Sequence, residues 1–139
     1  MTMGQDCLFL YGTLRKLLNK PMLHFIEKHS TFVGIGTVQG RLYNILTYPG
    51  MLPSDDPADQ VFGEVYELHH PGKIFAQLDP YERCGPDDPQ PHEYRRSQTE
   101  ATLTDDSTVR VWVYWYNHNI LEENRIDSGD YLKFLAERA

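Results

Sequence analysis

Residues 7–15 of the chain read Cys7-Leu8-Phe9-Leu10-Tyr11-Gly12-Thr13-Leu14-Arg15. The uninterrupted apolar run over 7–11 predicts a central strand that is buried on both faces. Gly12 ends this run and permits backbone angles that are closed to other residues. A tight turn here can direct successive backbone N–H groups at one anion. Tyr11, Gly12, Thr13 and Leu14 are therefore a candidate binding turn for a carboxylate or carbonyl oxygen. The alternative is an ordinary turn that ends a strand.

Outward from this run, most of the chain predicts strands. Residues 32–45 alternate between apolar and polar side chains with several glycines, which predicts one long strand bent at those glycines. Residues 61–68 alternate with period two and predict a second strand. Residues 93–103 and 109–116 predict a β-hairpin joined by 104–108. Long strands bent at glycines favour a sheet that curls into a barrel.

The remaining segments predict short helices and loops. One helix is expected to begin near Asn19 and Pro21, because proline is favoured in a first turn. A second is expected to begin at Pro71, and Asp127 or Ser128 is expected to cap a closing helix. The proline-rich segments 48–60 and 85–91 predict loops. No regular alternation of strand and helix is found, so we expect an α+β fold and not a doubly wound sheet.

Length and charge exclude several classes of function. A chain of 139 residues predicts one domain, 1–139. The net charge is −7 and no basic run is present, so nucleic acid is not an expected partner. No segment has the ~18 apolar residues that a membrane span needs, and residues 1–6 lack a secretory signal pattern. We therefore expect a cytoplasmic protein in which Cys7 and Cys84 stay reduced.

Two segments carry candidate polar groups. In Leu78-Asp79-Pro80-Tyr81-Glu82, the apolar residues share a helical face and Glu82 follows them, where a carboxylate can project into a cleft. Glu82 can equally be a solvated surface acid, and Asp79 is an equal candidate on composition. Period two places Trp112, Tyr114 and Tyr116 on one face of a strand, where they either line a pocket or simply pack. The sequence contains no zinc-ligand spacing, phosphate-binding glycine loop or serine nucleophile elbow.

Together these segments resemble one family. The matching segments, in chain order, are Leu8-Phe9-Leu10-Tyr11-Gly12-Thr13-Leu14-Arg15, Gly40-Arg41-Leu42-Tyr43, Tyr48-Pro49-Gly50, Val61-Phe62-Gly63-Glu64-Val65-Tyr66, Leu78-Asp79-Pro80-Tyr81-Glu82, Tyr94-Arg95-Arg96, Val111-Trp112-Val113-Tyr114 and Ser128-Gly129-Asp130-Tyr131. The chain resembles the γ-glutamylcyclotransferase superfamily, in the small branch that includes γ-glutamylamine cyclotransferases and AIG2-like proteins. The resemblance covers nearly the whole chain.

The resemblance implies a fold, a reaction and a site. It implies a small mixed β-barrel with short flanking helices. It also implies an enzyme of transferase or lyase type that converts a γ-glutamyl amine or peptide into 5-oxoproline and a free amine, with no cofactor or metal. The residues from Tyr11 to Leu14 would bind the substrate through backbone N–H groups. Glu82 would transfer protons, and Tyr94 or Tyr116 would hydrogen-bond substrate.

The implied reaction places a demand on Glu82, and two other functions remain open. An α-ammonium titrates near 8 and a reference Glu near 4.3, so unassisted proton transfer between them costs about 5 kcal/mol. A catalytic Glu82 therefore needs a raised pKa, which burial beside Tyr81 would supply. The first alternative is a non-catalytic module of the same fold that binds a small carboxylate. The second is a protein-interaction domain that docks partners through its proline-rich loops. The oligomeric state and the identity of the γ-glutamyl compound are left open by the sequence.

Overall fold

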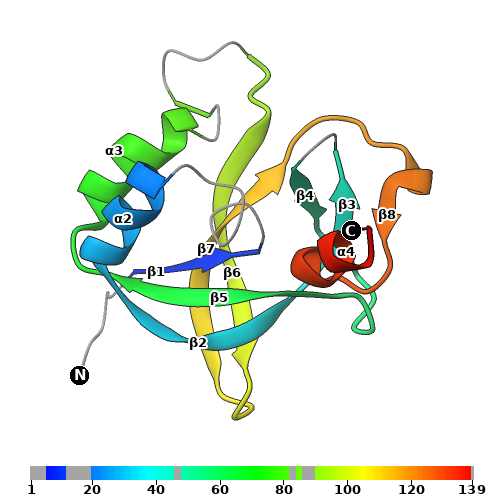
Figure 1. Cartoon of the computed structure of the whole chain (residues 1–139), viewed down its shortest axis with the longest axis horizontal. Coiled ribbons are helices and arrows are strands. Elements are labelled where there is room, and N and C mark those ends of the chain that lie inside the picture. The colour runs from blue at the N-terminus through cyan, green and yellow to red at the C-terminus, as the bar shows by residue number, and fades with distance from the viewer. Residues whose placement is uncertain (1–5, 12–19, 46–47, 82–83, 86–89, 139) are drawn as a thin grey trace.

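The computed structural model describes residues 6–11, 20–45, 48–81, 84–85 and 90–138 (Figure 1). Its centre is a closed barrel with the strand order β1 (Cys7–Leu10), β5 (Gln60–Leu68), β2 (Ser30–Gln39), β6 (Tyr94–Leu103) and β7 (Thr108–Tyr116). β1 pairs antiparallel with β5 and parallel with β7, so the barrel is mixed. The predicted α+β fold with a small mixed barrel and short helices is confirmed.

The apolar run at β1 occupies the middle of the hydrophobic core. All four of its residues are buried, as predicted. Phe9 points into the barrel among Val61, Val65 and Val113. Leu8 and Leu10 point outward into a second apolar layer beneath the helices. A strand buried on both faces needs apolar residues at consecutive positions, which explains why this run does not alternate.

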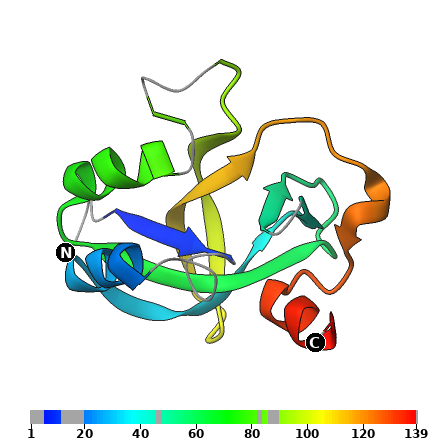
Figure 2. The ribbon, with the colours of Figure 1, turned by 45° about the horizontal axis from the view of Figure 1, so that its top comes forward.

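Two helices cover one side of the barrel. α2 (Lys20–Lys28) and α3 (Pro71–Tyr81) both lie there, whereas α4 (Tyr131–Arg138) lies on the opposite side (Figures 1 and 2). The predicted helices are confirmed, but the cap of α4 is two residues later than Ser128. Asp130 Oδ1 accepts a hydrogen bond from Lys133 N at 3.1 Å, the contact expected of a capping residue.

A second, smaller sheet corrects two predictions. It consists of β4 (Pro49–Leu52), β3 (Arg41–Asn44) and β8 (Arg125–Ile126), and β8 follows a short 3-10 turn at Glu122–Asn124. The strand predicted over 32–45 is two strands separated at Gly40, where a Cβ would lie 2.9 Å from Leu52 O. The loop predicted over 48–60 contains β4. Met51 is fully buried opposite Leu42, so core packing stabilises β4. The prolines in and beside this segment are typical of a loop, which is why its sequence does not predict a strand.

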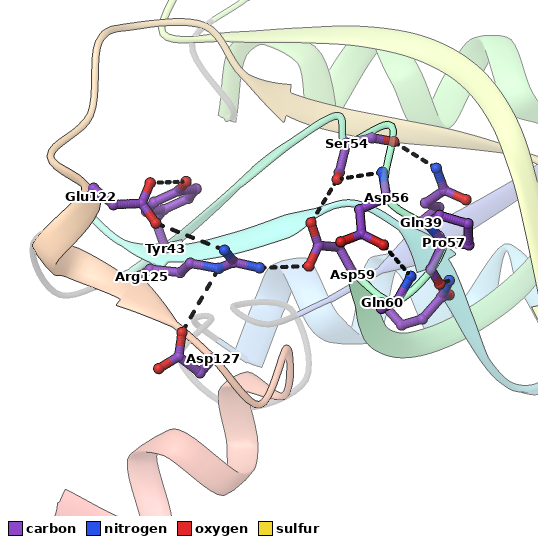
Figure 3. Close-up of polar contacts among 11 residues, drawn as sticks. Gln39, Tyr43, Ser54, Asp56, Pro57, Asp59, Gln60, Glu122, Arg125 and Asp127 are labelled. Atoms are coloured by element: carbon purple, nitrogen blue, oxygen red, sulfur yellow. Dashed lines mark hydrogen bonds and ion pairs between the residues drawn. The ribbon is translucent and has the colours of Figure 1, made fainter.

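An ion-pair network fastens this smaller sheet to the segment before β5. Figure 3 shows Arg125 with Asp59, Glu122 and Asp127 around it. Arg125 Nη2 donates to Asp59 Oδ1 at 2.7 Å, and Ser54 Oγ donates to Asp59 Oδ2 at 2.6 Å. Tyr43 donates its hydroxyl to Glu122 Oε1 at 3.0 Å. The network joins β8, β3 and the residues that precede β5.

Because of this network, we expect the free energy of unfolding to decrease as the pH becomes acid. The hydrogen bond from Ser54, and then the hydrogen bond and charge of Arg125, lower the pKa of Asp59 below its ordinary value of 3.8 despite its burial. A lowered folded-state pKa contributes stability above the unfolded value, and this contribution is lost as the pH falls through the folded value. We expect urea midpoints to fall less between pH 5 and about pH 2.5 in Asp59→Asn than in the wild type. Equal slopes in both proteins would contradict this assignment.

Candidate active site

The β6–β7 hairpin brings a row of large side chains to one face. Its register pairs Tyr94 with Tyr116, Arg96 with Tyr114 and Gln98 with Trp112. Because side chains alternate across a strand, these residues share the outer face of the barrel, against α3. The predicted common face of Trp112, Tyr114 and Tyr116 is confirmed. The opposite face, with Val113 and Trp115, fills the barrel interior.

Hydrogen bonds connect this face to β1 and α3. The Tyr11 hydroxyl, buried beyond the end of β1, donates to the backbone carbonyl of Tyr114 at 2.5 Å. The Tyr114 hydroxyl donates to Asp79 Oδ1 at 2.5 Å. Asp79 lies in the last turn of α3. Tyr114 therefore connects the end of β1 to the end of α3, through its backbone carbonyl at one end and its hydroxyl at the other.

Arg96 holds the same carboxylate from the neighbouring strand. Its Nε and Nη2 donate to the two oxygens of Asp79 at 2.9 and 3.0 Å. Its guanidinium lies 3.9 Å from the ring centre of Phe75 and 4.7 Å from that of Trp112. Burial lowers the pKa of Arg96, but the hydrogen bond and charge of Asp79 outweigh it and raise this pKa above its ordinary value. Asp79 and Arg96 thus form a fixed, charged pair.

A second group of phenols lies where β6 begins and β7 ends. The Tyr94 hydroxyl donates to Pro49 O at 2.6 Å, and Tyr48 donates to Glu93 Oε2. The ring of Tyr116 packs edge to face on Tyr94. Within the described residues, no hydrogen bond involves the Tyr116 hydroxyl. Burial, and then the charge of Glu93, raises the pKa of Tyr116. Its hydroxyl is therefore a protonated donor at neutral pH.

The predicted site residues divide into two groups. Tyr11, Tyr94 and Tyr116 are described and lie on the elements given above. Glu82, Gly12, Thr13 and Leu14 lie outside the described residues, so their predicted roles stay predictions. In sequence, Gly12 directly follows Tyr11, and Glu82 lies three residues after Asp79.

Sequence reasoning missed two members of this arrangement. Arg96 has no predicted role of its own in the sequence, yet its place two residues after Tyr94 on a strand puts both on one face. The alternation of side chains along a strand is therefore enough to predict that Arg96 lies beside Tyr94. Tyr48 lies in the predicted loop 48–60, and its contact with Glu93 joins segments 45 residues apart in sequence. Nothing local in the sequence indicates that contact.

A surface hollow of about 430 Å³ lies elsewhere, between α2 and the outer face of β2 and β5. Glu27, Ser30, Phe32, Glu64 and Tyr66 line it, and none of these was a predicted site residue. In the part of the chain that the structure describes, no helix has the length and apolarity of a transmembrane span. The same part holds no group of His, Cys, Asp and Glu side chains arranged for a metal ion.

Comparison of the fold with solved structures found several similar proteins. An AIG2-like protein from Mus musculus superposes with a TM-score of 0.66 at 20% identity, covering 91% of this chain and 88% of its own. An uncharacterized protein from Pyrococcus horikoshii gives 0.64 at 20% identity, covering 96% and 95%. A γ-glutamyl cyclotransferase gives 0.57 at 13% identity, covering 82% and 68%. At these identities the likeness concerns the fold alone.

Comparison of the sequence with curated proteins found no match. A family model was matched, described as "Gamma-glutamyl cyclotransferase, AIG2-like", over residues 8–133. The matched range includes most of β1, the end of α3 and the β6–β7 hairpin, the elements that carry the Asp79–Arg96 pair and the phenols beside it. The resemblance found in the sequence is thereby confirmed over almost the whole chain. The chain belongs to the AIG2-like γ-glutamyl cyclotransferase family.

Proposed function

We propose that this protein is an enzyme that cyclises a γ-glutamyl amine or peptide to 5-oxoproline and releases the amine. The family match over residues 8–133 is the observation that carries the proposal. The α-amine of the γ-glutamyl group attacks its own γ-carbonyl, so the new C–N bond closes a five-membered ring. The old C–N bond then breaks, and the leaving amine takes a proton.

Glu82 is the proposed acid and base for both proton movements. It first removes the proton of the attacking amine and then gives a proton to the leaving amine, so its own charge is restored. The alternative acid, Asp79, is poorly suited, because its carboxylate already accepts hydrogen bonds from Arg96 and Tyr114. A base must have an oxygen available to the substrate proton. Because the Asp79 carboxylate already accepts these hydrogen bonds, Glu82 is the better candidate for the acid and base.

The backbone of Tyr11, Gly12, Thr13 and Leu14 is the proposed oxyanion and carboxylate site. One preorganised donor is worth about 3 kcal/mol of barrier in comparable sites. The hydrogen bond from Tyr11 to the Tyr114 carbonyl fixes the residue at which this segment begins. A folded substrate held there also has its amine and carbonyl close together, which reduces the entropy cost of ring closure.

A product assay tests the proposal. Purified protein is incubated with a panel of γ-glutamyl amino acids, peptides and alkylamines, and 5-oxoproline is measured by mass spectrometry. The proposal predicts 5-oxoproline from at least one compound, in amounts that grow with time and enzyme. A module that only binds small carboxylates would instead bind 5-oxoproline and form none.

Tyr116 is the proposed phenol donor to substrate, because the Tyr94 hydroxyl already donates to Pro49 O. We expect Tyr116→Phe to raise KM about 2- to 10-fold with little change in kcat, the effect of losing one hydrogen bond made equally in ground and transition states. Tyr94→Phe is the matched control. It should lower thermal stability, since Pro49 O loses its donor, and leave KM nearly unchanged. The reverse pattern would assign substrate contact to Tyr94.

A further inference from the structure

Asp79 lies between the two segments that the proposed function requires, the oxyanion turn that begins at Tyr11 and the segment that contains Glu82. We call its carboxylate and the groups bound to it the junction. Its carboxylate receives the Tyr114 hydroxyl, and the Tyr114 carbonyl receives the Tyr11 hydroxyl. Tyr11 is the first residue of the proposed oxyanion turn, and Asp79 lies three residues before Glu82. Two hydrogen bonds, both made by Tyr114, thus join the first residue of the proposed turn to the end of the helix that precedes Glu82.

Asp79 also fastens the chain on the far side of Glu82. Cys84 N donates to the backbone carbonyl of Asp79 at 2.9 Å, and Cys84 Sγ lies 3.9 Å from Asp79 Oδ1. Glu82 lies between these two residues in sequence. The segment that contains Glu82 therefore begins at Asp79 and is joined back to Asp79 at Cys84.

Arg96 makes this junction rigid. Its two parallel hydrogen bonds fix the plane of the Asp79 carboxylate, which one donor alone would not do. The guanidinium also packs against Phe75 of α3 and Trp112 of β7, so stacking joins the helix to the hairpin in addition to the hydrogen bonds. The pair is largely buried, with 25% of Arg96 and 20% of Asp79 exposed. Solvent screening of the interaction is accordingly weak.

We propose that Asp79 is a positioning residue for catalysis, which sets the end of α3 relative to the end of β1. The inference rests on the proposed function and adds a role for a residue that does not touch substrate. A merely structural ion pair would affect folding stability alone. Positioning predicts a loss in kcat beyond the loss in stability, because a misplacement of about 1 Å can cost about 100-fold in rate.

The chain provides a matched control in Asp59 and Arg125. This pair joins an aspartate to an arginine at 2.7 Å, with similar exposures of 16% and 28% (Figure 3). It lies in the network of β8 and β3, away from Tyr114 and α3. Asp79→Asn and Asp59→Asn therefore remove the same charge from comparable settings. Both should lower Tm, and assays are run well below both transitions.

The expected result concerns kcat and not KM. Asp79→Asn should lower kcat by about 10- to 100-fold with a change in KM below about threefold. Asp59→Asn should leave kcat within about twofold of the wild type. Arg96→Lys keeps the positive charge but not the two parallel donors. Its kcat should therefore lie between that of Asp79→Asn and that of Asp59→Asn. Equal kcat values in Asp79→Asn and Asp59→Asn would overturn the proposal.

A double-mutant cycle with Glu82 separates positioning from general damage. If Asp79 acts through Glu82, then Asp79→Asn should lower kcat by less than about threefold once Glu82 is Gln, because the positioned group is already lost. A full further loss in the double variant would overturn the proposal. If Glu82→Gln is inactive while Asp79→Asn is fully active, only this inference fails. A wild type that forms no 5-oxoproline overturns both it and the proposed function.

Discussion

Glu82→Gln is expected to lower kcat by roughly 10²- to 10⁴-fold on any γ-glutamyl compound that the wild type turns over, the usual loss when a general acid or base is removed. Glutamine preserves the shape and hydrogen-bonding capacity of the side chain but does not carry a proton between two amines. The proposed mechanism requires a buried Glu82 carboxyl, and burying a carboxylate is costly, so stability should hold or rise slightly in the glutamine variant. Binding of 5-oxoproline should survive, because the backbone turn supplies most of the proposed contacts.

The control for this variant is Glu122→Gln. Glu122 is 70% exposed and belongs to the Arg125 network, far in sequence from α3. Its kcat should equal that of the wild type within about twofold. If Glu82→Gln keeps more than about a tenth of the wild-type rate, Glu82 is not the acid or base. Asp79 or the substrate's own groups would then become the better explanation.

Gly129→Ala is expected to have the largest effect on stability. Gly129 has a φ of 70°, and a Cβ there would lie 1.9 Å from Gln60 O. The clash is with backbone at the start of β5, and Phe62 N donates to Gly129 O at 2.8 Å, so neither segment moves easily. Left-handed strain alone costs on the order of 1–3 kcal/mol, and the clash adds to it. We expect a loss of at least about 3 kcal/mol in urea unfolding.

Gly72→Ala is the matched control for the glycine prediction. A Cβ at Gly72 would meet no atom within 4 Å, and the residue lies in the first turn of α3. Alanine favours helix over glycine by roughly 0.5–1 kcal/mol, so this variant should be as stable as the wild type or slightly more stable. Similar losses in both variants would mean that the tight packing of Gly129 is not the cause.

Much of the barrel could be predicted from local patterns, and so could β3, but the other two strands of the smaller sheet could not. β1 and the β6–β7 hairpin have strong apolar or alternating runs, so their strands are visible in sequence. β8 has only two residues, and β4 lies among prolines. Both strands exist because β3 pairs with them on its two edges. Such pairing depends on long-range contacts, which a single sequence does not display.

Part of the candidate site could likewise be predicted from the sequence, and part of it could not. Period two placed Tyr114 and Tyr116 on one face, and the structure agrees. The pairing of Asp79 with Arg96 was not predictable, because it joins a helix to a strand 17 residues away. Composition alone made Asp79 and Glu82 equal candidates. The family resemblance implies Glu82, and the hydrogen bonds that occupy Asp79 add a physical reason, which depends on how α3 packs against the hairpin.

The most direct test of cyclisation is to run the reaction in H₂¹⁸O and measure both products by mass spectrometry. Intramolecular attack by the α-amine uses no water. The prediction is therefore that unlabelled 5-oxoproline and the free amine form in equal amounts. Hydrolysis would instead give glutamate with ¹⁸O in its γ-carboxylate. Labelled glutamate, or no 5-oxoproline from any γ-glutamyl compound tested with folded wild-type protein, would contradict the proposed function.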